Sequence, residues 1–288
     1  SRVLYSPAVV AGEGLLMRIL PIAKMSGRGI GACLGIFCLL LAACASDDKD
    51  AYVDRPVDEL YNDAMNKLEE GDYKKSAKLF DEVERQHPYS PWATKAQLMA
   101  AFAHYKADQY DEAIAAADRY IELHPANPDV AYAYYLKGLS YYERISDIHR
   151  DQNMTVDAKK VFEELVSRYP DSEYARDAKI KIELCNDHLA GKEMTVGRFY
   201  LRRAQYLAAI NRFRTVISQY QSTTHVPEAL LRLTEAYTAL GLDEEARRTA
   251  AVLGYNYPGS EWYADAYKLV GASADRGRPG GTGATASF

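Results

Sequence analysis

The pattern of apolar residues from Val57 onward is helical. Leu230, Leu233 and Tyr237 illustrate it, because they recur three and four residues apart, one turn of an α-helix, with alanines beside them. No run of alternating apolar and polar residues, the pattern typical of a half-buried strand, competes with this periodicity. The chain is therefore predicted to fold as an all-α protein.

The helical segments repeat five times along the chain. In each copy a small residue lies 12 residues before a closing position, which is proline in four copies and glutamine in one. A small residue lets the backbones of two helices approach each other, and proline ends the second helix. The five pairs are Ser76 and Pro88, Ala113 and Pro125, Ala158 and Pro170, Ala209 and Gln221, and Ala246 and Pro258.

This arrangement resembles the tetratricopeptide repeat, a pair of helices of about 34 residues with small residues at their crossing. We expect a solenoid of five such repeats over residues 57–271, in which each repeat covers the core of its neighbour. The closing positions are 37, 45, 51 and 37 residues apart. The third repeat therefore carries extra residues in its turn, between Ser146 and Thr155, and the fourth begins with a helix extended around Ala178 to Ala190.

A short apolar stretch, residues 29–41, is preceded by Arg28 and followed by two alanines and Cys44. These features predict a secretory signal, because the apolar stretch is shorter than the roughly 20 residues of a membrane-spanning helix. The end of the stretch resembles the lipobox of bacterial lipoproteins. That resemblance implies cleavage before Cys44, with a diacylglycerol on its thiol and an acyl chain on its new amine. An ordinary signal that happens to contain cysteine is the alternative.

This interpretation divides the chain into four parts. Residues 1–43 are predicted to be removed, residues 44–56 to form the lipidated N-terminus and a polar tether, residues 57–271 the solenoid, and residues 272–288 a disordered glycine-rich tail. Alanine, not aspartate, follows the lipidated cysteine. In enteric-type bacteria an aspartate there tends to retain lipoproteins in the inner membrane. We therefore expect a protein anchored to the outer membrane that faces the periplasm.

The balance of charge argues against nucleic acid as a partner. The chain has 35 basic and 40 acidic residues. Removal of residues 1–43 takes away four basic and one acidic residue, which leaves 31 basic against 39 acidic residues in the mature chain. Nucleic acids and anionic headgroups attract positive charge, so membrane contact is expected through the lipid instead.

No catalytic or metal-binding motif is found in the sequence. The six histidines lack the spacing of a zinc site, and processing leaves Cys185 as the one cysteine without lipid. With His188 one helical turn away, Cys185 could act as a nucleophile, but a cysteine on a helix is more often a small buried apolar residue. We expect no enzyme activity, no metal, and no cofactor besides the covalent lipid.

A binding surface is the expected feature instead. In tetratricopeptide proteins the first helix of each pair lines a groove that takes extended peptides, and here the first helices carry rings and aliphatic side chains. Aromatic rings give a large contact area and lose little side-chain rotational entropy on binding, which suits a ligand with aromatic side chains. The alternative is that many of these tyrosines only pack between helices. By register, the groove positions are Tyr61, Met65, Leu98, Phe102, Tyr105, Tyr135, Leu139 and Tyr142.

Three strings carry a more specific resemblance. Residues 83–90 read VERQHPYS, residues 196–200 read VGRFY, and residues 251–260 read AVLGYNYPGS. Together with the lipobox and the long turn of the third repeat, they resemble the BamD family, the tetratricopeptide lipoproteins of the β-barrel assembly machinery. The chain departs from the commonest pattern of that family at Gln221 and in its glycine-rich tail.

The resemblance implies a lipid-anchored periplasmic scaffold that promotes the folding and insertion of outer-membrane proteins. In that family the N-terminal repeats receive the C-terminal strand signal of an unfolded barrel protein. The C-terminal repeats dock on the last periplasmic POTRA domain of BamA, beside the other subunits of the machinery. Arg212, next to Asn211, matches an arginine that pairs with an acidic residue of that partner. The alternative is another periplasmic tetratricopeptide lipoprotein, such as a pilotin or a scaffold for cell-wall enzymes.

Overall fold

The computed structural model describes residues 54–276, with side chains up to Gly271. Within this range the chain forms helices and no strand, as predicted, and none of these helices has the length and apolar character needed to cross a bilayer. The predicted signal, Cys44, most of the tether and residues 277–288 lie outside the described residues. The helices are α2 (Val57–Glu69), α3 (Tyr73–Gln86), α4 (Pro91–Lys106), α5 (Tyr110–Leu123), α6 (Val130–Tyr142), α7 (Asn153–Arg168), α8 (Glu173–Arg202), α9 (Tyr206–Gln219), α10 (Val226–Ala239), α11 (Asp243–Asn256) and α12 (Glu261–Arg276).

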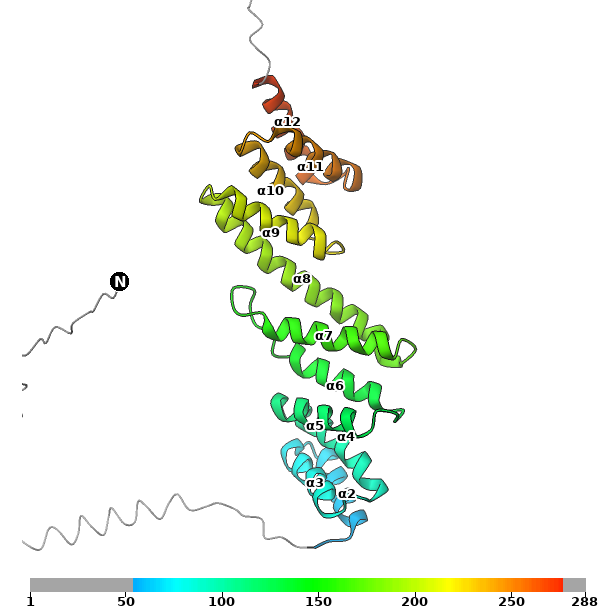
Figure 1. Cartoon of the computed structure of the whole chain (residues 1–288). Helices are drawn as coiled ribbons and strands as arrows, with labels where there is room; N and C mark the ends of the chain where they lie inside the picture. Colours follow the sequence, from blue (N-terminus) through cyan, green and yellow to red (C-terminus); the bar gives the residue numbers. More distant parts are fainter. Residues whose placement is uncertain (1–53, 277–288) are drawn as a thin grey trace, which may run out of the picture. The chain divides into compact units, whose positions relative to one another are not determined.

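The helices from α2 to α11 form five pairs, and α12 follows the last pair (Figure 1). Each helix packs against the next one in the chain. The first helices of successive pairs also contact one another, whereas within residues 54–276 successive second helices do not. First helices therefore form the inner layer of the stack, and second helices spread apart on the outer layer. This arrangement confirms the predicted solenoid of five repeats.

The predicted small residues lie on the second helix of each pair and are enclosed by the core. The hydroxyl of Ser76 donates a hydrogen bond of 2.9 Å to the carbonyl oxygen of Ala64 on α2, so its polar group is satisfied inside the core. All five small residues are fully buried: Ser76, Ala113, Ala158, Ala209 and Ala246.

In two repeats a phenylalanine ring of the second helix rests directly on a glycine of the first. A Cβ atom added to Gly138 would lie 2.5 Å from the ring of Phe162, and one added to Gly197 would lie 2.5 Å from the ring of Phe213. Carbon atoms in contact are normally about 3.5–4.0 Å apart. A side chain at either glycine would therefore push the two helices apart.

The turns inside four of the repeats contain a residue in the left-handed conformation. The φ angles are 81° at Gly71, 59° at Asp108, 56° at Ala204 and 74° at Gly241. Glycine adopts this conformation readily, whereas alanine at this position costs roughly 1 kcal/mol. The third repeat has the longer turn that the spacing predicted, residues 143–152.

Every second helix ends two residues before its closing position, including α9, which is followed by Gln221 in place of proline. The residue at the end of α9, Tyr220, has φ −127° and ψ 48°. His87, which precedes a proline at the end of α3, has nearly the same angles, −131° and 54°. Packing of the repeat therefore sets this helix end even where proline is missing.

Helix α8 joins two apolar cores. It has 30 residues and is about 45 Å long at 1.5 Å per residue, which confirms the extension predicted before the fourth repeat. Ala178 and Cys185 belong to the core around α6 and α7, whereas Ala190 and Met194 belong to the core of the last two repeats. One continuous helix therefore holds the third repeat to the fourth.

Ordered structure extends beyond the predicted solenoid at both ends. Helix α12 runs to Arg276, so the predicted start of the disordered tail at 272 falls inside a helix. Residues 272–276 read ASADR, a segment free of glycine and proline that helix propensity favours. At the other end, the backbone N–H of Arg55 donates to Oε1 of Gln86 (3.0 Å), and its carbonyl oxygen lies 2.7 Å from Nε2 of His87.

The contact between Gly197 and the ring of Phe213 predicts a stability difference. Gly197→Ala should lower the free energy of unfolding by about 1–3 kcal/mol, because the added methyl overpacks a closed helix crossing. Gly271→Ala is the matched control, since nothing lies within 4 Å of its Cβ position, and it should be neutral or raise stability by up to about 1 kcal/mol. Urea unfolding followed by circular dichroism measures both. Equal stability of the two variants would contradict this account of the crossing.

Candidate functional site

The predicted groove residues all lie on the inner layer, on the first helices of repeats one to three. They are partly buried, and they fall into three neighbouring groups in place of one shared pocket. Their helices are α2 for Tyr61 and Met65, α4 for Leu98, Phe102 and Tyr105, and α6 for Tyr135, Leu139 and Tyr142.

The first group lines a cavity of about 460 Å³ between repeats one and two, to which Tyr61 and Leu98 contribute. The ring of Tyr61 lies 5.5 Å from that of Phe80 and 4.8 Å from that of Trp92. Burial raises the pKa of Tyr61, so its hydroxyl stays protonated at neutral pH. Met65 packs against the core of the first repeat. The other lining residues are Pro91, Thr94, Lys95, Met99, Tyr120, Asn127 and Asp129.

The second group is a cluster of tyrosines where α6 meets α8. Tyr135 stacks on Tyr174 with ring centroids 5.3 Å apart, and Tyr132 lies 5.1 Å from the same ring. The hydroxyl of Tyr135 donates a hydrogen bond of 2.6 Å to Asp177. Burial, and then this carboxylate, raise the pKa of Tyr135. These rings are therefore held rigidly, and the hydroxyls remain neutral donors.

Phe102 and Tyr105 pack, as Tyr132 does, against a buried cluster formed by Ala101, Ala116, Ala117 and Leu136. The hydroxyl of Tyr105 lies 3.5 Å from Glu143 at the end of α6. Phe102 thus packs between helices, whereas Tyr105 also carries a hydroxyl near Glu143.

The aromatic residues of this region that were not among the predicted positions include Trp92, Tyr132 and Tyr174. Helical spacing contains a signal for Tyr132, because it precedes Tyr135 by three residues and so lies on the same face. No comparable signal exists for Tyr174, since its contact with α6 depends on how α8 packs.

The third group is Tyr142 with residues of α8. The ammonium group of Lys181 lies 4.5 Å from the centroid of the Tyr142 ring, within the range of a cation–π contact. Tyr142 also lines a second cavity of about 310 Å³ together with Ile145 and Leu184. Leu184 is half exposed, so this part of the inner layer presents apolar surface beyond the predicted positions.

The two residues of the nucleophile alternative do not form a reactive pair. Cys185 is fully buried, and burial raises the pKa of its thiol to about 11 despite the opposing charges of Lys159 and Lys181. A thiol with this pKa is protonated at neutral pH, and the thiolate is the reactive form. Nε2 of His188 lies 2.9 Å from the carbonyl oxygen of Ser146, to which it can donate.

The predicted docking residues Asn211 and Arg212 are both exposed on α9. Nη1 of Arg212 lies 3.1 Å from Oε2 and 3.3 Å from Oε1 of Glu193 on α8. The side chain of Arg212 is 45% exposed, and its guanidinium carries further N–H donors besides those directed at Glu193.

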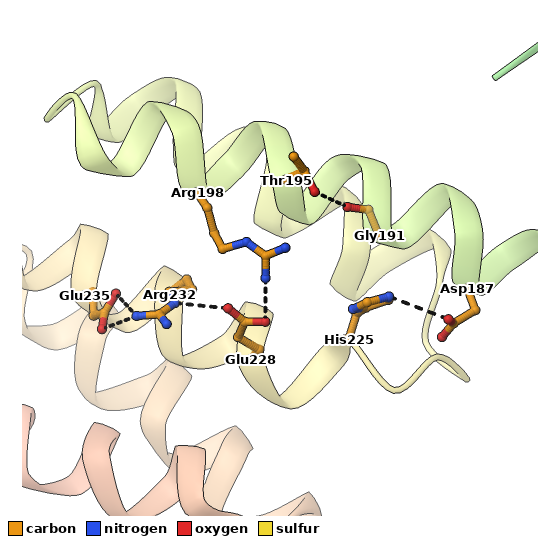
Figure 2. A network of polar contacts seen from close by, with 8 residues as sticks. All are labelled: Asp187, Gly191, Thr195, Arg198, His225, Glu228, Arg232 and Glu235. Carbon is orange, nitrogen blue, oxygen red and sulfur yellow. Dashed lines mark hydrogen bonds and ion pairs between the residues drawn. The ribbon is translucent and has the colours of Figure 1, made fainter. Parts of the chain in front are cut away.

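A polar network holds α8 and α10 together beneath this region (Figure 2). Arg198 of α8 reaches Glu228 of α10 at 2.8 Å, and Glu228 also pairs with Arg232 at 3.3 Å. Arg232 makes two further contacts with Glu235 at 2.9 and 3.1 Å. Burial opposes the charge of Arg232, but the two carboxylates outweigh it and raise its pKa.

A second contact across α8 and α10 joins Asp187 to Nε2 of His225 at 3.6 Å (Figure 2). The ring of His225 fits against Gly191, where an added Cβ atom would lie 3.3 Å from the same nitrogen. Contacts over these separations in sequence were not predicted. They hold the start of α10 against α8, on either side of α9 in the chain.

No group of three or more histidine, cysteine, aspartate or glutamate side chains within residues 54–276 could hold a metal ion. What the described residues bring together is a layer of fixed rings and, on α9, exposed arginine. Such surfaces bind other chains through apolar area and charge.

Comparison with known proteins shows what this chain is similar to. Residues 53–253 match the family described as outer membrane lipoprotein, YfiO. The outer membrane protein assembly factor BamD of Caulobacter vibrioides is 51% identical over 80% of this chain and 76% of its own length. BamD of Rickettsia prowazekii is 48% identical over 81% and 92% of the two chains, and BamD of Neisseria meningitidis serogroup A is 38% identical over 80% and 92%.

Proposed function

The chain belongs to the BamD family of outer membrane protein assembly factors, and from this membership we propose that it captures unfolded barrel proteins on its inner layer and docks on BamA through α9. It is a lipid-anchored lipoprotein of the outer membrane and a member of the assembly machinery there. The pilotin and cell-wall scaffold alternatives are not favoured, because the matched relatives are assembly factors. The family is not one of known enzymes, and our proposal includes no covalent step.

The observation that carries the proposal is the set of fixed rings on α2, α4 and α6. An extended peptide that ends a barrel strand carries aromatic side chains, which rings and leucines bind through apolar area. Because Tyr61, Tyr135 and Tyr142 are already held by neighbouring side chains, little rotamer freedom is lost when a peptide binds.

For the anchor, we propose diacylglycerol and an acyl chain on Cys44. Each buried methylene contributes about 0.8 kcal/mol, and two or more chains are needed for stable anchoring. Cys44→Ala should therefore move the protein from the membrane pellet to the soluble fraction after cell lysis, as measured by immunoblot. A variant that stays in the pellet after a high-salt wash would contradict lipidation at this residue.

For the peptide groove, Tyr105→Ala is the test, because Tyr105 combines a ring on the inner layer with a hydroxyl 3.5 Å from Glu143. The Tyr105 ring also packs against the buried cluster that contains Leu136, so circular dichroism must show that the variant is folded. Loss of the Tyr105 ring should weaken binding of a barrel protein's C-terminal peptide about tenfold, the effect of losing a well-packed aromatic contact. Fluorescence anisotropy measures the affinity. The matched control is Tyr89→Ala, since Tyr89 is 99% exposed and should leave the affinity unchanged. Equal affinity of both variants would remove Tyr105 from the groove.

For docking, Arg212→Glu should strongly reduce recovery of BamA in a pull-down from detergent-solubilised membranes. The substitution replaces a guanidinium, which can bind a partner's carboxylate at two points, by a carboxylate that would repel it. The new carboxylate would also lie beside Glu193. Glu193→Gln is the informative companion, because it frees Arg212 from its internal partner and should preserve or increase recovery of BamA. Undiminished recovery with Arg212→Glu would exclude this arginine from the interface.

A further inference from the structure

A third surface lies on the outer layer, between the second helices α9 and α11. It is an apolar groove of about 420 Å³ whose floor is Leu230 and Leu233 of α10. Ile217 of α9 and Val252 of α11 form its walls, and Val252 is 46% exposed. Because successive second helices do not contact each other, this groove stays open to solvent.

The rim of this groove is positively charged. Arg214 stands on the α9 side and Arg248 on the α11 side. Arg248 is shared between Glu244 at 3.3 Å and Glu245 at 3.4 Å, so its charge is largely compensated. Among the side chains that the structure describes, residues 54–271, no carboxylate pairs with Arg214. An uncompensated guanidinium therefore stands beside an apolar groove.

The segment of sequence that includes Arg214 is also positively charged. Between Glu193 and Glu228 the chain contains five arginines and neither lysine, aspartate nor glutamate. Two of the five, Arg198 and Arg212, are paired with carboxylates of flanking residues. The others leave a local excess of positive charge in a chain whose formal net charge is −5.

We propose that this groove is a docking site for an acidic segment of another polypeptide, which places a leucine- or phenylalanine-type side chain on Leu230 and Leu233 and a carboxylate on Arg214. The apolar floor and walls supply the contact for one large side chain. The planar fork of arginine supplies a two-point contact for the carboxylate.

This proposal concerns a different face from those in the proposed function. The peptide groove lies on first helices, whereas this groove opens between second helices. Arg212 contacts α8, and Arg214, two residues later and so nearly opposite on the helix, faces α10 and α11. A failure of either earlier proposal therefore leaves this one untouched.

A polypeptide fits the groove better than a lipid surface does. The groove is a depression of the size of a few side chains between two helices, and a bilayer is flat on that scale. A second copy of the same face would bring arginines together, which like-charge repulsion disfavours.

The test uses the purified full-length lipoprotein in detergent and three fluorescein-labelled peptides. The first is Glu-Glu-Leu-Phe-Glu-Glu, the second replaces its glutamates by lysines, and the third replaces Leu-Phe by Gly-Gly. The first peptide should bind more tightly than both others, and more weakly as salt is raised, because screening reduces the contact with arginine. In a fourth measurement, without detergent, the protein is mixed with vesicles of phosphatidylcholine that contain one quarter phosphatidylglycerol. This measures whether the groove binds an anionic lipid surface.

Two substitutions assign the binding to the groove. Arg214→Gln should weaken the first peptide about tenfold through loss of the charge-assisted contact. Val252→Glu, at a half-exposed position, should do the same by placing a carboxylate inside the groove. Arg202→Gln removes an equal charge from the same arginine-rich segment outside the groove and should change the affinity less than twofold. Circular dichroism confirms that each variant is folded.

Three results would overturn the proposal. One is equal affinity for the three peptides, or no binding of the first. Another is unchanged affinity of both Arg214→Gln and Val252→Glu. The last is binding of anionic vesicles that depends on Arg214 while the acidic peptide does not bind, which would make the site a lipid contact.

Discussion

Close approach of two helix backbones is the constraint on which each repeat depends. At the crossing of α8 and α9, Ala209 is fully buried and the ring of Phe213 rests on Gly197. The thickness of a ring then sets the distance between the helices. The ring of Phe162 rests on Gly138 in the same way, and the second helix of every repeat has a fully buried small residue. Contacts with neighbouring helices then position the tyrosines of the inner layer, as those with Tyr174 and Asp177 of α8 do for Tyr135.

Helix α8 connects the third repeat to the last two repeats. Its Cys185 lies in the core around α6 and α7, and its Met194 lies in the core of the last two repeats. The ion pair of Arg198 with Glu228 and the contact of Asp187 with His225 add polar links to α10. The proposed peptide-binding region on α2, α4 and α6 and the proposed docking region on α9 are therefore connected by one helix, with no flexible linker between them.

The chemistry of each surface suits an assembly factor. The inner layer offers neutral, immobilised rings, and burial keeps the pKa of hydroxyls such as Tyr132 near 12, far above neutral pH. The region around α9 offers arginines, which select carboxylates and act at longer range. In the proposed function, binding by a lipid-anchored protein raises the local concentration of client near the rest of the machinery and needs no covalent step.

The sequence by itself determined the repeat, its five copies, the long third turn and the extended α8, because each follows from the distances between small residues and closing positions along the chain. Ser76 and Pro88 stand 12 residues apart as Ala246 and Pro258 do. The signal and the lipid on Cys44 are likewise predictions from sequence. Only the tertiary structure decided that the groove residues form three groups and that Tyr174 joins one of them. It also decided that an apolar groove opens between α9 and α11. These features depend on how one helix rotates and packs against helices tens of residues away, and no local spacing encodes that rotation.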